Sequence, residues 1–228
     1  QKPEITRLRD TDGDGVCDSY ETLTNAWGLS TNFHEFAFGP APDGKGGFYG
    51  TLGIAIVPGG ATRNEQEKNR GSVWHVDAAG RFRVVALGLR APNGLGTNLE
   101  GDLFFTDNQG DWVPACPLSH VEDGAFYGQK FSLPDRNADV PRKLPACWLP
   151  YNRIANSATA IGAFPKDGSF GPFEGQLIVG DLAKASLMRV FLERIDGEYQ
   201  GACFPMRAGF SSGVERFVFG PDKKLWVG

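Results

Sequence analysis

The stretch DTDGDGVCDSYE, residues 10–21, has the composition and spacing of a calcium-binding loop. Carboxylate side chains fall at the loop positions that face the ion, and a glycine stands where the chain must turn sharply. The ligands predicted from this spacing are Asp10, Asp12, Asp14, Asp18 and Glu21, together with the main-chain carbonyl of Val16. Because calcium takes six to eight oxygen ligands, so many carboxylates in register favour a calcium site over a solvated acidic turn.

The segments that flank this loop indicate what the ion would do. Upstream, residues 3–9 (PEITRLR) make no apolar helical stripe, and downstream, residues 22–30 (TLTNAWGLS) contain threonines and a glycine but no run of helix formers. A calcium sensor of the helix–loop–helix type needs a helix on each side of its loop. We therefore predict a strand–loop–strand hairpin that a structural calcium ion holds together.

The composition is that of a globular protein built from many short strands. Of the 228 residues, 41% are hydrophobic and 22% are charged, and the 31 glycines and 15 prolines are spread along the chain. The net charge of −4, without a basic cluster, argues against nucleic acid as a partner, and no apolar run is long enough for a membrane span. Because no signal peptide begins at Gln1, we expect that a secretion signal was removed or that the sequence is part of a longer chain.

None of the four cysteines has the spacing of a metal site. Cys116 and Cys147 share a Pro-Ala-Cys context and bracket a proline-rich segment, so they are candidates for a disulfide, with two free thiols as the alternative. We expect Cys17 and Cys203 to be buried as small apolar residues. A possible disulfide and a calcium loop suited to millimolar calcium favour a periplasmic or secreted location.

An internal repeat predicts the fold. Four segments share an apolar pair, a turn with glycine and a short apolar strand, and they are residues 36–53, 96–110, 170–181 and 217–228. Each is predicted to be a β-hairpin. The middle two copies align Gly101 with Gly175 and Asp107 with Asp181, so we expect these two aspartates to cap equivalent turns.

A second hairpin follows two of the copies, at residues 70–88 and 185–202, and paired hairpins would make four-stranded sheets. Repeated four-stranded sheets predict an all-β fold of the β-propeller type, with an irregular β-sandwich as the alternative. We predict one domain over residues 1–228 with about four partial blades, in which residues 112–161 are a long insertion. Four partial blades leave an open sheet edge, so the remainder of a propeller chain is an expected partner.

Several of these motifs also point to a known family. GLRAPNG (residues 88–94), GDLFFTDNQGDW (101–112), HEFAFGP (34–40) and FYGQKFSL (126–133) resemble the glucose/sorbosone dehydrogenase family. The resemblance is closest to the large secreted dehydrogenase-like proteins of environmental bacteria. It implies a six-bladed propeller that uses pyrroloquinoline quinone (PQQ) to oxidise a sugar or polyol, with an electron acceptor such as a cytochrome.

The resemblance also assigns roles to individual residues. It implies that a histidine accepts the substrate's hydroxyl proton, that an arginine contacts the quinone carbonyl, and that a second calcium ion binds beside the cofactor. The family pattern places His34 as the base, Arg90 and Asn93 at the quinone, Gln109 and Gly110 at the cofactor's calcium, and Lys184 and Arg216 at the quinone carboxylates. Ala91 stands where the family has an asparagine, and His34 is closer to the following Gly-Pro than the pattern requires.

Other interpretations of these residues stay open at this point. Arg90 could brace a turn, and His34 could be a structural histidine within a strand. The rival function is a non-catalytic propeller that serves as a binding or assembly module. A metal-dependent lactonase on a similar propeller is less favoured, because the sequence shows no Glu/Asn/Asp metal set. His75 is expected to be exposed or paired within its sheet, and His120 to lie at the surface or near substrate.

Overall fold

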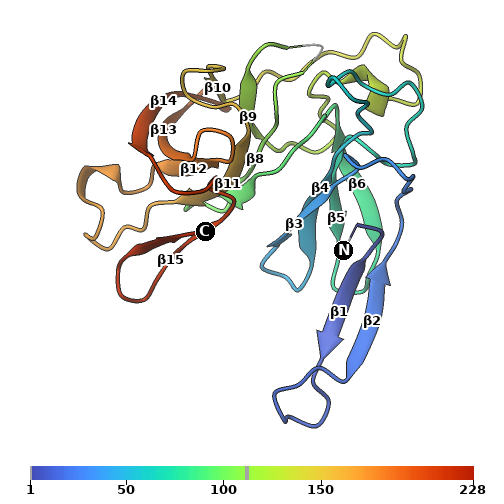
Figure 1. Ribbon diagram of the computed structural model, residues 1–228, viewed down its shortest axis with the longest axis horizontal. Coiled ribbons are helices and arrows are strands. Elements are labelled where there is room, and N and C mark those ends of the chain that lie inside the picture. The colour runs from blue at the N-terminus through green and yellow to red at the C-terminus, as the bar shows by residue number, and fades with distance from the viewer. Residues whose placement is uncertain (1, 111–112) are drawn as a thin grey trace.

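The computed structural model of the chain describes residues 2–110 and 113–228, and its regular secondary structure consists of β-strands and two short 3-10 helices (Figure 1). Trp112, at which the predicted insertion and one family motif meet, lies outside the described residues. The elements in chain order are β1 (Ile5–Arg9), β2 (Ser19–Thr24), β3 (Ala37–Pro42), β4 (Phe48–Leu52), β5 (Ser72–Val76), β6 (Phe82–Leu87), β7 (Leu95–Thr97), β8 (Leu103–Thr106), β9 (Cys116–His120), η1 (Lys130–Ser132), β10 (Cys147–Leu149), β11 (Ala158–Ala163), η2 (Gly171–Phe173), β12 (Leu177–Asp181), β13 (Ser186–Ile195), β14 (Glu198–Ala208), β15 (Phe217–Phe219) and β16 (Leu225–Val227).

Three four-stranded antiparallel sheets form the body of the molecule. Each is an up-and-down meander of consecutive strands, in the order β3-β4-β5-β6, β7-β8-β9-β10 and β11-β12-β13-β14. A fourth unit begins with the hairpin β15–β16. The first strands lie side by side, since β7 contacts both β3 and β11, and Figure 1 shows the sheet β7–β10 between the other two. Sheets fanned about their first strands are the blades of a propeller, so the predicted fold is confirmed.

The predicted hairpins follow from local sequence. Residues 36–53 form β3–β4, residues 70–88 contain β5–β6, and residues 185–202 lie in β13–β14, each with a turn where the sequence predicts one. The prediction was wrong for residues 170–181, which contain η2 and only one strand, β12; its hairpin partner β11 precedes the segment. In the tight turn of β5–β6, Gly80 takes a φ of 81°, a left-handed value that residues with a Cβ rarely adopt. Turns of this kind bring the two strands into antiparallel register.

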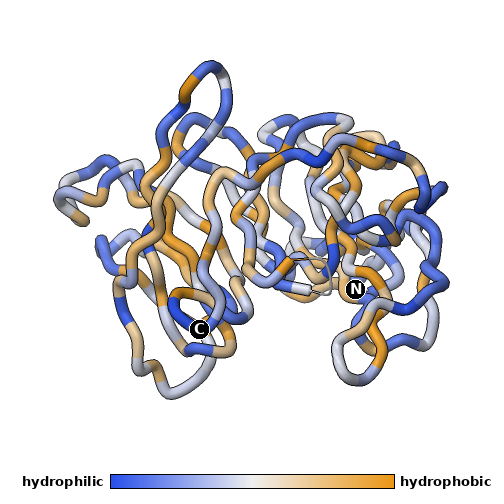
Figure 2. Tube along the Cα trace, turned by 90° about the horizontal axis from the view of Figure 1, so that it is seen from above, coloured by the Kyte–Doolittle hydropathy of each residue, from blue (hydrophilic) through white to orange (hydrophobic). Residues whose placement is uncertain are grey.

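The hydrophobic core lies between neighbouring sheets. Its largest cluster joins the sheet β7–β10 to the sheet β11–β14 and includes Phe104, Leu118, Leu149, Val179 and Val190, all of which are fully buried. Because both faces of a blade are covered, strands such as β12 are buried along their whole length rather than alternating. Figure 2 shows the same arrangement, with apolar segments inside the sheets and most of the polar segments in the outer loops.

The hairpin β1–β2 confirms the predicted strand–loop–strand form of the acidic loop. Its strands pair antiparallel, with Arg7 opposite Glu21. Trp27, just after β2, stacks on Trp74 of the first blade, with the ring centroids 5.6 Å apart. The hairpin extends beyond the sheet β3–β6 in Figure 1.

Residues 112–161 are not a single insertion between strands. They include β9 and β10, which complete the second blade, and the start of β11, which opens the third. The irregular part is the connection of residues 121–146, which contains η1. The prediction was wrong because β10 has only three residues and pairs with a strand far away along the chain.

The cysteines are all free, so the candidate disulfide between Cys116 and Cys147 is not formed. These residues lie on paired strands, but Cys116 is opposite Leu149 and Cys147 is opposite Leu118. Diagonal partners on neighbouring strands are typically about 7 Å apart, which is beyond the reach of a disulfide bond. Cys17 and Cys203 are half-buried rather than fully buried as expected.

Within the described residues, none of the helices has the length and apolar character needed to cross a membrane.

Glycines allow the second and third blades to meet at their first strands. A Cβ atom added at Gly96 in β7 would lie 2.4 Å from the carbonyl oxygen of Ile161 in β11, and one added at Gly94 would lie 1.9 Å from that of Thr159. Real Cβ atoms do not approach backbone so closely, so the contact between these strands depends on glycine.

We expect Gly96→Ala to lower the free energy of unfolding by about 1–3 kcal/mol, because the added methyl group forces β7 away from β11. The measurement is urea denaturation followed by circular dichroism. The control is Thr97→Ala in the same strand, since Thr97 is exposed and its truncation should change the stability by less than about 0.5 kcal/mol. Equal stability of the two variants would contradict the proposed contact.

Candidate functional site

The segments before each first strand and after each second strand lie at the same end of the blades. In an up-and-down meander these two segments are neighbours, and backbone hydrogen bonds join them in every unit. The bonds are Gly53 N–H to Phe36 O, Thr106 N–H to Gly94 O, Leu182 N–H to Ser157 O and Gly228 N–H to Arg216 O. We call this end, formed by residues 30–36, 53–63, 88–94, 107–110, 150–157, 181–185 and 213–216, the site face.

All seven residues assigned to the cofactor or to catalysis by family resemblance lie on the site face. His34 precedes β3, Arg90 and Asn93 precede β7, Gln109 and Gly110 follow β8, Lys184 follows β12, and Arg216 precedes β15. Their sequence positions span almost the whole chain, so the topology is what brings them to one end of the molecule.

Arg90 lies at the centre of one group on this face. It is 8% exposed, and its guanidinium donates hydrogen bonds to the carbonyl oxygens of Gln109, at 3.0 Å, and of Gly60. The predicted alternative, an arginine that braces turns, therefore describes its contacts in this structure. Through them Arg90 joins the segment after β8 to the loop of residues 57–62.

Asp107 fixes the backbone of the same turn. Its carboxylate is buried and accepts hydrogen bonds from the N–H groups of Arg90 and Ala91, both at 2.7 Å, and from that of Asn108 at 2.8 Å. Burial disfavours the charged form and raises the pKa of Asp107 to about 6, although these hydrogen bonds oppose the shift.

Asp181 does the same in the next blade. It accepts hydrogen bonds from the N–H groups of Asn156 and Ser157, which precede β11, and from that of Lys184. The prediction that Asp107 and Asp181 cap equivalent turns is confirmed.

His34 lines a pocket of about 450 Å³ that adjoins the Arg90 group. The ring of His34 packs edge-on against Phe33 and Phe36 and makes no hydrogen bond to another described residue. Val57 and Arg63 line the same pocket, and they flank Gly60, whose carbonyl accepts from Arg90. His34 and Arg90 thus both lie beside the loop of residues 57–62.

Next to His34 in the chain is a buried carboxylate that the sequence does not single out. Glu35 is fully buried and accepts hydrogen bonds from the N–H and hydroxyl groups of Ser30. Arg63 donates to the same hydroxyl at 3.2 Å. Arg63 therefore brings a positive charge to the His34 pocket, and no motif in the sequence indicates it.

Asn93 and Arg216 form a second group. The Arg216 guanidinium donates to the side-chain oxygen of Asn93 at 2.9 Å, and the Asn93 amide donates to Glu215 at 3.2 Å. The side chain of Arg216 is 54% exposed and so can reach a ligand on the site face. Glu215 was missed by sequence analysis, although it stands beside Arg216 in the chain.

The three remaining predicted cofactor residues are engaged elsewhere on the site face. Lys184 is half-buried, and its ammonium group donates to the carbonyl of Asn152 at 3.0 Å. The side-chain oxygen of Gln109 accepts from the thiol of Cys116 at 3.5 Å, and the N–H of Gly110 donates to the carbonyl of Val113.

The other two histidines have partners within their own blades. His75 lies 2.8 Å from the Asp43 carboxylate and packs on Tyr49, and Asp43 has its pKa lowered to about 2, chiefly by its hydrogen bond with His75. His120, at the end of β9, lies 3.2 Å from Glu122 and packs on Phe104. Neither is on the site face.

In the acidic loop, the carboxylate oxygens of Asp10, Asp12 and Asp18 all lie within 4.8 Å of one another. Asp14 accepts a hydrogen bond from the N–H of Val16 and lies outside this cluster. Glu21, predicted as the last ligand, forms ion pairs with two arginines of β1, at 3.5 Å from Arg7 and 3.2 Å from Arg9.

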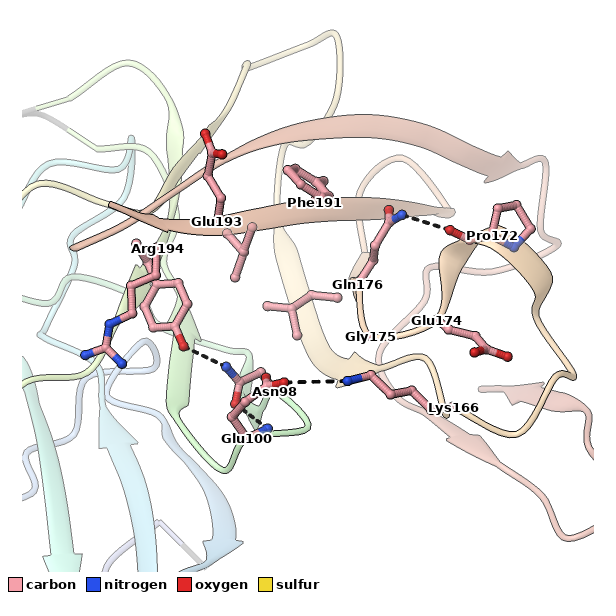
Figure 3. A pocket seen from close by; sticks show the side chains of 13 residues that line it. Asn98, Glu100, Lys166, Pro172, Glu174, Gly175, Gln176, Phe191, Glu193 and Arg194 are labelled. Carbon is pink, nitrogen blue, oxygen red and sulfur yellow. Dashed lines mark hydrogen bonds and ion pairs between the residues drawn. The ribbon is translucent and has the colours of Figure 1, made fainter. Parts of the chain in front are cut away.

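A separate pocket of about 450 Å³ opens at the opposite end of the blades (Figure 3). It lies between the turn of β7–β8, the segment that leads into β12, and the hairpin β13–β14. Its lining mixes charges of both signs, with Glu100 and Glu193 opposed by Lys166 and Arg194. None of the predicted cofactor residues lines it.

Comparison with known proteins identifies the fold through solved structures, whereas comparison of sequences identifies no relative. No protein-family model matches the sequence, and no curated protein is significantly similar to it. Among solved structures, an oxidoreductase (glucose dehydrogenase) from Thermus thermophilus superposes with a TM-score of 0.70 at 21% identity, over 98% of this chain and 68% of that protein. The chain has the fold of the soluble sugar dehydrogenases.

Two further structures agree. The soluble aldose sugar dehydrogenase of Escherichia coli, in the apo form, gives a TM-score of 0.67 at 15% identity, over 97% of this chain and 69% of that protein. The PQQ-bound aldose sugar dehydrogenase of Streptomyces coelicolor gives 0.57 at 17% identity, over 79% of this chain and 52% of that protein. The fold expected from the family resemblance is confirmed.

We expect Asp107→Asn to change how stability depends on pH. The folded-state pKa of about 6 lies above the ordinary value of 3.8, so Asp107 holds its proton more tightly in the folded protein. Its contribution is then fully present below about pH 4 and is lost as the pH rises through about 6, by on the order of 3 kcal/mol.

The measurement is urea denaturation of both proteins at several values between about pH 4 and pH 7. The free energy of unfolding of the wild type minus that of Asp107→Asn should fall as the pH rises, because the other carboxylates cancel in this difference. A difference that is constant over this range would show that Asp107 is not buried as described.

Proposed function

We propose that the chain is part of an extracytoplasmic PQQ-dependent dehydrogenase that oxidises a sugar or polyol on the site face. The observation that supports this best is that all seven residues assigned by family resemblance lie at one end of the blades, although they are up to 182 positions apart in the sequence. The sugar dehydrogenases with the same fold support it at the level of architecture.

The donors on the site face suit a planar tricarboxylate such as PQQ. Arg216 and Lys184 would bind its carboxylates, Asn93 would lie at the quinone beside Arg216, and Arg90 contributes a buried positive charge beside Gln109. Ala91 supplies no side-chain donor, and its N–H is already bound to Asp107. When bound, the quinone would accept the two electrons and the hydrogen that leave the substrate carbon as hydride.

The protein's own part in this reaction is to move a proton and to place charge. His34 would accept the hydroxyl proton on a ring nitrogen, which suits a histidine without a hydrogen-bonded partner among the described residues. Arg63, which lines the same pocket, and Arg90, which donates to Gly60 of the adjoining loop, would stabilise negative charge that develops near His34.

The test is reconstitution with PQQ and calcium, followed by cofactor absorbance and by dye reduction with a panel of aldoses. We expect His34→Asn to bind PQQ and to lose roughly 10²–10⁴-fold in kcat, because only proton transfer is removed. Arg216→Ala should weaken PQQ binding instead. The control is Arg83→Ala, since Arg83 is a similarly exposed arginine that pairs with Asp123 away from the site face.

A second function is favoured by one observation. Arg90 donates to two backbone carbonyls and Ala91 lacks the family's amide, which suits a propeller that kept its scaffold and serves as a binding or assembly module. The same experiment separates the two functions. Failure to bind PQQ and to reduce dye with every aldose would overturn the dehydrogenase and leave the binding module.

We also propose that the loop of residues 10–21 binds calcium as a structural ion. The cluster of Asp10, Asp12 and Asp18 supports this, with Asp14, the Val16 carbonyl and Glu21 as the remaining predicted ligands. Because Glu21 forms ion pairs with Arg7 and Arg9, it would have to exchange these partners for the ion.

We expect calcium to raise the melting temperature of the wild type with a Kd of roughly 10⁻⁴–10⁻³ M, and Asp12→Asn to weaken this binding at least about tenfold. Calorimetric titration provides the Kd. The matched control is Asp135→Asn, because Asp12 and Asp135 are both exposed and each accepts an N–H from two residues on. Unchanged affinity in Asp12→Asn would contradict the site.

A further inference from the structure

Two cysteines from neighbouring blades meet at the outer edge of the sheets. Cys147 is in β10, the outer strand of the second blade, and Cys203 is in β14, the outer strand of the third. The two strands contact each other. Both thiols donate to one acceptor, the carbonyl oxygen of Trp148, at 3.5 Å each, and both side chains belong to one hydrophobic cluster.

The pair is chemically unequal. The hydrogen bond between the two thiols lowers the pKa of Cys203 to about 7. The same hydrogen bond, together with burial, raises the pKa of Cys147. Cys203 is half-buried, so a small reagent can reach it. A reachable thiol with a lowered pKa is the one that attacks an oxidant first.

The other two cysteines have no such neighbour. Cys116 is fully buried beside the side chain of Gln109, and burial raises its pKa to about 11. Cys17 lies in the acidic loop at the far end of the hairpin β1–β2, where its thiol donates to the carbonyl of Ser19. Cys147 and Cys203 are thus the pair that the fold holds together.

We propose that Cys147 and Cys203 form a redox-sensitive pair, which a small-molecule disulfide converts into a disulfide bond that staples the second blade to the third at the rim.

The reaction balances with a disulfide as the oxidant. The Cys203 thiolate attacks the oxidant, which releases one reduced thiol and leaves a mixed disulfide on Cys203. The sulfur of Cys147 then attacks the Cys203 sulfur, forms the protein disulfide and releases the second reduced thiol. The two cysteines lose two electrons and two protons, and the two released thiols carry them.

The four cysteines lie in four different tryptic peptides, which makes the test direct. These peptides are residues 10–45, 91–130, 144–153 and 195–207. The folded protein is incubated with oxidised glutathione, remaining thiols are alkylated, and a non-reducing digest is analysed by mass spectrometry. We expect peptide 144–153 linked to peptide 195–207, with the other two cysteines alkylated and the protein still monomeric on a non-reducing gel.

Cysteine-to-serine variants identify the two residues that form the link. Cys203→Ser and Cys147→Ser should abolish the link, whereas Cys116→Ser, the matched control within the same blade, should keep it. Because the linked peptide is sought in the wild type, the test does not depend on the folding of any variant. Full alkylation of all four cysteines, a different pairing, or a stable glutathione adduct on Cys203 would each overturn the proposal.

The staple should also be measurable as stability. Cross-linking restricts the unfolded chain, so the oxidised protein should melt roughly 5 °C or more above the reduced protein. The shift should be absent in Cys203→Ser and present in Cys116→Ser. A melting temperature that does not rise in the linked protein would show that the bond strains the rim instead of holding it. None of these readouts involves PQQ. The disulfide proposal is therefore tested independently of the proposed function.

Discussion

The second and third units depend on a carboxylate that is buried where the second strand ends. Asp107 and Asp181 bind the successive N–H groups of the segment that leads into the first strand, and so hold the two segments of the site face together. A buried carboxylate is costly unless several donors surround it, so the turn can take only the shape that supplies them. The first unit uses a cation instead. Buried Arg70 donates to the carbonyls of Gly28 and Phe36 and ties the chain before β3 to the residues before β5. A carboxylate in the second and third units and a guanidinium in the first unit each hold two chain segments together. The carboxylate accepts from N–H groups, and the guanidinium donates to carbonyl oxygens.

This constraint also explains the two roles of Arg90. The backbone N–H of Arg90 donates to Asp107 in the second blade. The guanidinium of Arg90 donates to Gly60 in the loop that follows β4 of the first blade, so this residue links the two blades. A cation fixed in this way loses little conformational freedom when it acts on a ligand. The same contacts would hold a propeller together without any ligand, which is why the geometry of Arg90 is compatible with both an enzyme and a binding module.

Local patterns in the sequence predict most of the fold, and non-local contacts account for the rest. The hairpins were predictable because their turns carry glycine and their strands are adjacent in the chain. Strand β10 was not, since it has three residues and follows a long connection. Cys116 and Cys147 have matching contexts, yet the partner of Cys147 comes from the next blade. On the site face, motifs predicted Arg90 and Arg216, whereas Arg63 and Glu215 were assigned no role and are recognised only in the folded structure.

The boundary between the second and third blades is held at two distances from the propeller axis. Near the axis, Gly96 lets β7 lie directly against β11, and at the rim β10 contacts β14, where the thiols of Cys147 and Cys203 share one acceptor. Between these contacts lies the hydrophobic cluster that joins the two sheets, so packing along the whole boundary fixes the angle between them. Asn108 and Ser157 face each other across this boundary on the site face, with 3.4 Å between the Asn108 amide nitrogen and the serine oxygen. A ligand that bridges these blades would therefore contact Asn108 and Ser157. The distance between these two side chains is set by how the sheets pack together, and not by the loops that carry them.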